Sequence, residues 1–123
     1  MSIEVLVIQP GDDLRAVRTT IDGDHLAALQ QAVGGYIQIE NFGPAGQLVF
    51  NEEGVMRELP PNLTATRVAL QALNQPVQWL WGGQVLLGTV VVVGPTDGDG
   101  DLTSVRGAYV ARIEGIGVDV VDG

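Results

Sequence analysis

The run QVLLGTVVVVG, residues 84–94, constrains the fold of this chain more than any other feature. It is apolar at successive positions, and successive side chains of a β-strand point to opposite faces of the sheet. Both faces of this strand must therefore be covered, as in a central strand. The apolar part, residues 85–94, is far shorter than the roughly 20 residues that a membrane-spanning helix needs. We therefore expect a covered sheet and no membrane span.

The remaining secondary structure follows from shorter patterns. Alternating or β-branched runs bounded by glycine, proline or asparagine predict further strands at 3–9, 16–21, 36–42 and 47–54, and the aromatic segment 77–81 is a strand or a turn. The first two are expected to pair, and 36–42 and 47–54 to form an antiparallel hairpin. Apolar residues at helical spacing predict helices over 22–33, 63–73 and 102–113. The side chain of Asp22 or Asp24 is placed to cap the first helix, and that of Asn62 the second.

This order of elements predicts an α+β fold in one domain, residues 1–123. We expect a mostly antiparallel twisted sheet of about five strands with two to three helices. The tail, residues 114–123, is either an edge strand or flexible. Edge strands expose unpaired backbone groups, so such an edge is a site for pairing with another chain or for forming a homo-oligomer.

The charge of the chain excludes several classes of function. It carries six arginines, no lysine and 15 acidic residues, which gives a net charge of −9. Direct nucleic-acid binding is not expected, because it depends on clustered cations. The absence of lysine also excludes Walker-type phosphate loops and pyridoxal-phosphate sites. The acidity is either ordinary solubilising charge or the means of docking on a basic partner.

Catalytic residue types are scarce. The chain has one histidine, no cysteine and serine only at positions 2 and 104, so few nucleophile and base pairs are available. His25 lies near the start of a predicted helix and is interpreted as a solvent-facing or cap residue. We expect no cofactor and no resident metal. The protein is expected to be cytoplasmic in a bacterial host, since cysteine is absent and no secretory signal is recognised.

Three groups of side chains are candidate sites. Asp97, Asp99 and Asp101 occupy the first ligand positions of a calcium loop, but Leu102 and Ala108 stand where its glycine and glutamate belong, so they are weak metal candidates. Glu52 and Glu53 are adjacent, so on a strand only one of them faces a given pocket. A solvated turn is the alternative. Trp79 and Trp81 form either an aromatic platform or part of the core.

The glycine pair in AVGGYI, residues 32–37, raises the question of a ligand cradle. Gly34 follows the last apolar helical position, Val33, where a left-handed cap residue is usually glycine. An anion cradle needs the amides of a helix N-terminus, whereas these glycines follow a helix C-terminus. We therefore interpret Gly34 as a helix stop. Gly35 allows the chain to turn into the strand, and the ring of Tyr36 is expected in the core or beside a pocket.

Several segments together resemble one known family. The segments VLVIQPG, LAALQQAVGGYIQI, LVFNEEG, LPPN followed by TAT, and GTVVVVG followed by an Asp-Gly loop are similar to the domain of unknown function 3846. The resemblance covers about residues 3–105. It implies no activity and no catalytic residue, and its setting among phages, plasmids and actinobacteria implies an accessory protein of a phage or mobile element. The segment NQPVQWLW, with its two tryptophans, departs from the family pattern.

Three functions stay open on these grounds. The first is a non-enzymatic protein that binds a host protein, for host take-over, anti-defence or regulation. The second is an oligomer that sequesters a small nucleotide-type signal. Its pocket would lie near Gly34, Gly35, Tyr36, Asn51 and Asn62, with Arg57 or Arg67 adding positive charge. The third is an enzyme with a metal held by carboxylates of Glu52, Glu53 and the aspartates of 97–101. The candidate ligand-binding residues are Gly35, Tyr36, Asn51, Glu53, Asn62, Arg67, Trp79 and Trp81.

Overall fold

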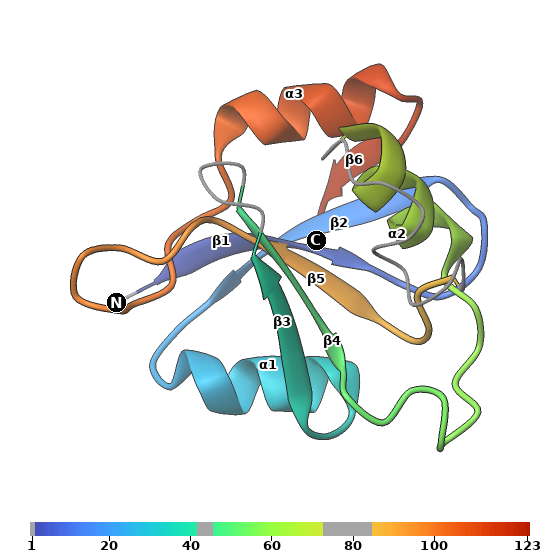
Figure 1. Ribbon diagram of the computed structural model, residues 1–123. Helices are drawn as coiled ribbons and strands as arrows, with labels where there is room; N and C mark the ends of the chain where they lie inside the picture. The colour runs from blue at the N-terminus through green and yellow to red at the C-terminus, as the bar shows by residue number, and fades with distance from the viewer. Residues whose placement is uncertain (1, 42–45, 73–84) are drawn as a thin grey trace.

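A computed structural model describes residues 2–41, 46–72 and 85–123, and within them six strands form one sheet with helices on both faces (Figure 1). The strands are β1 (Ile3–Ile8), β2 (Arg15–Ile21), β3 (Ile37–Asn41), β4 (Gln47–Asn51), β5 (Val90–Val93) and β6 (Asp119–Asp122). The helices are α1 (His25–Val33), α2 (Leu63–Arg67) and α3 (Gly107–Gly115), and α2 continues directly into a π-helical segment, η2 (Val68–Ala72). The predicted α+β class is confirmed.

The strand order is β3-β4-β5-β1-β2-β6, with every neighbouring pair antiparallel except β2 and β6, which are parallel. The predicted pairing of the first two strands and the predicted hairpin of β3 with β4 are both confirmed. The sheet has six strands, one more than the approximately five that the sequence predicts. The sixth strand comes from the tail, which α3 carries back to lie beside β2.

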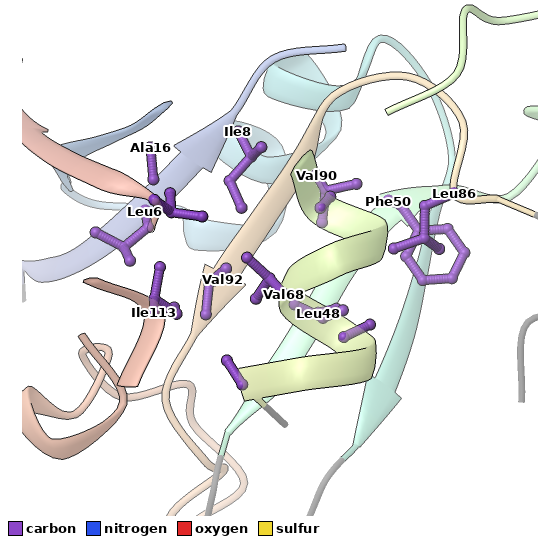
Figure 2. Close-up of a cluster of buried hydrophobic side chains, with 14 of the residues drawn as sticks. Leu6, Ile8, Ala16, Leu48, Phe50, Val68, Leu86, Val90, Val92 and Ile113 are labelled. Carbon is purple, nitrogen blue, oxygen red and sulfur yellow. The ribbon is translucent and has the colours of Figure 1, made fainter. Parts of the chain in front are cut away.

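The two faces of the sheet are covered by different helices. In the view of Figure 1, α1 lies below the sheet, and α2 and α3 lie above it. Figure 2 shows the upper cluster, in which Leu6 and Val92 from the sheet meet Ile113 from α3. On the lower face, Leu29 and Val33 of α1 pack with aliphatic residues of the sheet. All four valines of β5 are buried, as expected for a strand covered on both faces.

Two strand boundaries differ from the predictions because turns interrupt the apolar or polar runs. The strand predicted over 84–94 begins only at Val90, since Gly88 has a left-handed φ of 76° and its N–H donates to the carbonyl of Pro60 at 2.7 Å. The strand predicted over 47–54 ends at Asn51, where the turn of residues 52–58 begins.

The third helix begins at Gly107, so its prediction over 102–113 is wrong at the start. Leu102 instead forms a β-bridge with Thr96. The N–H of Val105 donates to the carbonyl of Glu4 at 2.9 Å, so residues 103–105 run beside β1 rather than coiling. The apolar residues spaced across 102–113 therefore do not share one helix. Those before Gly107 lie in a loop that runs beside β1, and the others lie on α3.

The predicted helix over 63–73 is described as far as Ala72, and the aromatic strand or turn predicted at 77–81 lies outside the described residues. Among the described residues, none of the helices combines the length and the apolar character that crossing a membrane requires.

Candidate functional site

The ends of α1 are formed as the sequence predicts. Asp24 is the N-cap, and its Oδ1 accepts a hydrogen bond of 3.1 Å from the N–H of Ala27. Gly34 is the C-cap in the left-handed region, with φ 81°, and its N–H donates to the carbonyl of Gln30 at 2.9 Å. The interpretation of Gly34 as a helix stop is confirmed.

Three polar candidates from the sequence meet just beyond this C-terminus. Buried Asn51 donates from Nδ2 to the carbonyl of Val33 at 3.1 Å, and its Oδ1 accepts from the N–H of Glu53 at 2.8 Å. Arg57 forms an ion pair of 3.5 Å with Glu53 and donates to the carbonyl of Gly34 at 3.3 Å. These groups bind one another and the backbone, so their arrangement holds α1 against β4 and the following turn.

The structure also shows the surroundings of Tyr36 and Gly35, which follow this helix end. The ring of Tyr36 does not enter the core, because the residue is 66% exposed. Gly35 packs closely on Asn51, since a Cβ at position 35 would lie 3.1 Å from Asn51 Nδ2. Close packing of the backbone on a side chain therefore explains the second glycine.

Asn62 lies elsewhere, on the opposite face of the sheet at the start of α2. It is fully buried, and its Nδ2 donates to the carbonyls of Ile8 and Gly88, both at 2.9 Å. Its Oδ1 accepts from the N–H of Ala65 at 2.9 Å, so the predicted cap is confirmed. Arg67, half-buried in the last turn of α2, belongs to this side as well. The predicted ligand residues are thus divided between two places.

The remaining predicted sites are also separated. Asp97 Oδ1 accepts from the N–H groups of Asp99 and Asp101, at 2.9 and 3.0 Å, so its side chain stabilises a turn. Among the described residues, no three histidine or acidic side chains are grouped closely enough to hold a metal ion. Trp79 and Trp81 lie outside the described residues, so the aromatic platform stays a prediction.

An open groove of about 440 Å³ lies between the start of α1, β3 and the loop after β5. Its lining comes from three segments: Gly23, Asp24, His25, Leu26 and Leu29; Ile37 and Ile39; and Gly100, Asp101 and Leu102. The lining includes five aliphatic side chains, and the exposed residues Asp24 and Asp101, called the rim below, carry carboxylates. None of the six arginines of the chain lines it.

Sequence reasoning missed this groove because its parts are distant along the chain. The helical spacing of Leu26, Leu29 and Val33 indicates that the three side chains share one face of the helix. Leu29 and Val33 are buried, but Leu26 is 54% exposed and Ile39 is 40% exposed. Large aliphatic side chains exposed together beside a concave surface are typical of a protein-binding site. The only signal was the alternation of Ile37 and Ile39 with polar residues.

Comparison with known proteins identifies a family whose description names no activity. A family model described as a domain of unknown function (DUF3846) matches residues 3–115. No curated protein matches the chain. No solved structure matches it either.

Proposed function

This chain belongs to the family of the domain of unknown function DUF3846, and we propose that it is a non-enzymatic accessory protein of a phage or mobile element that acts by binding a host protein. Host take-over, anti-defence or regulation are the roles that such binding serves. The groove between α1, β3 and the 100–102 loop is the contact surface.

The observation that carries this proposal is the composition of the groove. Exposed Leu26 and Ile39 offer apolar area that gains stability when a partner covers it, at about 25 cal/mol per Å² removed from water. Asp24 and Asp101 at the rim select for a partner with positive charge. The net charge of −9 adds long-range attraction for the same kind of partner.

The same charges disfavour the nucleotide alternative at this groove. A phosphate placed here would face Asp24 and Asp101 without an arginine among the lining residues. The amide and carbonyl groups of Asn51 and Asn62, which the sequence offered to a nucleotide, already bind the protein itself. A cyclic or ADP-ribose-type nucleotide that raises the melting temperature of the protein would favour sequestration instead.

The arrangement of the carboxylates disfavours the metal-enzyme alternative. Glu53 pairs with Arg57 beyond the C-terminus of α1, whereas Asp101 lies in the groove beside its N-terminus. These side chains are therefore at opposite ends of a nine-residue helix.

The experiment uses two matched leucines. Leu26 in the groove is 54% exposed, and Leu63 at the start of α2, on the other face, is 43% exposed. The whole chain and its Leu26→Arg and Leu63→Arg variants are immobilised, and host lysate is passed over them at physiological salt. We expect a host protein retained by the wild type and by Leu63→Arg and lost from Leu26→Arg. Equal retention by both variants, or none by the wild type, contradicts the proposal.

Circular dichroism and the melting temperature of each variant are measured first. Both leucines are exposed, so we expect both variants to fold like the wild type.

A further inference from the structure

We infer that the partner binds as an extended segment that pairs with the outer edge of β3, and that apolar and basic residues alternate in this segment. The inference rests on the proposed function and names the chemistry of the partner at the same groove.

The pairing of β3 with β4 determines where the backbone groups of β3 point. The N–H of Glu52 donates to the carbonyl of Tyr36 at 2.9 Å, one position before the register pair of Ile37 with Asn51. Hydrogen-bonded and non-hydrogen-bonded pairs alternate along an antiparallel ladder. Ile37 and Ile39 are therefore in non-hydrogen-bonded pairs with β4, and their N–H and C=O groups point away from it.

These groups point to the outer edge of the sheet. β3 is the terminal strand of the sheet, and in the part of the chain that the structure describes no strand pairs with its outer edge (Figure 1). The N–H and C=O groups of Ile37 and Ile39 are therefore placed to pair with an added strand. The other terminal strand, β6, has Asp119 and Asp122 at its two ends, whereas β3 carries one charge, that of Glu40.

The outer edge of β3 and the groove share two residues. The residues whose backbone points outward, Ile37 and Ile39, are the residues of β3 whose side chains line the groove. In a paired strand, the residue directly opposite points to the same face. Apolar side chains of the added segment would therefore enter the groove beside Leu26, and the alternate side chains would point to the opposite face.

The alternate residues of the added segment would face the polar side chains of β3. On the opposite face, β3 presents Gln38 and Glu40, where Gln38 Nε2 donates to Glu40 Oε1 at 2.9 Å. A basic residue across from Glu40 would form an oppositely charged cross-strand pair. Asp24 and Asp101 at the groove rim attract flanking basic residues. A segment in which apolar and basic residues alternate would therefore match the groove on one face of β3 and the polar side chains on the other.

The probe is a short blocked peptide in which valine and arginine alternate. It is titrated into the isotope-labelled full chain, and amide shifts and amide hydrogen exchange are followed by nuclear magnetic resonance. We expect shifts at residues 37–41 and slower exchange of the N–H of Ile39. Leu26→Arg should weaken binding by about tenfold or more, and Leu63→Arg should leave it unchanged.

Two control peptides separate strand pairing from simple charge attraction. Methylating the backbone nitrogens that would face β3 removes the donors and should weaken binding by about tenfold. Replacing arginine with glutamate should abolish binding. Unchanged affinity after methylation, or amide shifts confined to other surfaces, overturns strand pairing at β3.

The outcomes distinguish this inference from the proposed function. If a host protein is lost on Leu26→Arg while the peptide leaves the amides of β3 unshifted, the groove binds a partner in another way and only the strand inference fails. If neither the host protein nor the peptide depends on Leu26, both fail.

Discussion

The side-chain amide of Asn51 donates a hydrogen bond of 3.1 Å to the carbonyl oxygen of Val33, the last residue of α1. The same side chain accepts from the N–H of Glu53, so one buried residue ties the helix end to the turn after β4. Gly35 packs against it, at a position where a Cβ would lie 3.1 Å from Asn51 Nδ2. The cluster that the sequence offered to a ligand is thus a joint between helix and sheet.

Replacing Asn51 with alanine is expected to lower the free energy of unfolding by about 1–3 kcal/mol, because a buried carbonyl and a partly buried amide lose their partner. Urea denaturation measures this loss. Asn51 does not line the groove, so peptide affinity should stay at the wild-type value. Loss of peptide affinity in a folded Asn51→Ala protein would instead place Asn51 at the binding surface.

Asn62→Ala is expected to cost more, about 2–4 kcal/mol, because the side chain joins the backbones of β1, the turn before β5 and the first turn of α2. Three hydrogen bonds are lost, with Ile8, Gly88 and Ala65. Urea denaturation is again the measurement. The matched control is Gln31→Ala, at an exposed position of α1, which should change stability by less than about 0.5 kcal/mol. Equal stability of the two variants would contradict the structural role of Asn62.

Gly94→Ala should prevent normal folding, whereas Gly98→Ala should be tolerated. A Cβ at position 94 would clash with the carbonyl oxygen of Ser104, while one at position 98 would meet nothing within 4 Å. The close approach exists because the N–H of Gly94 donates to the carbonyl of Thr103 at 2.9 Å. Soluble yield and melting temperature are the measurements, and a Gly94→Ala protein as stable as Gly98→Ala would show that the 103–104 segment can move away at little cost.

Self-association through β6 should be suppressed by its charges. If two copies of β6 paired antiparallel, Asp119 of one would face Asp122 of the other at both ends, and like charges opposite each other are destabilising. We expect the wild type to stay monomeric by light scattering and the Asp119→Asn, Asp122→Asn double variant to self-associate.

The matched control for β6 removes the same charge elsewhere, at exposed Asp12 and Asp13 in the loop after β1. If the wild type is already a dimer, or if both double variants behave alike, the charges of β6 do not govern association.

Local patterns predicted those parts of the fold that depend on neighbours in the chain. The caps of α1 and α2 were recognisable because Asp24 and Asn62 bond amides three residues away. The burial of β5 followed from its consecutive valines, since a strand that is apolar at every position needs cover on both faces. The hairpin of β3 and β4 followed from two alternating runs separated by a short turn.

The same patterns failed where a distant segment competes for the backbone. Leu102 and Val105 have helical spacing, yet the bond from Val105 to Glu4 holds this segment beside β1, about 100 residues earlier in the chain. Leu26 has the spacing of a buried helix position, but no element of the described chain covers it fully. Spacing reports which residues share a face, and not what packs against that face.

The sequence by itself determined the α+β class, the central place of the valine run, the helix caps and the exclusion of lysine-dependent chemistry, because each depends on residue type or on short-range spacing. Only the tertiary structure decided the role of Asn51, the bonds of Asn62 to the carbonyls of Ile8 and Gly88, the parallel docking of β6 and the groove. Those depend on which backbone carbonyl lies within about 3 Å of a side chain, and on loops from distant segments meeting at one sheet edge.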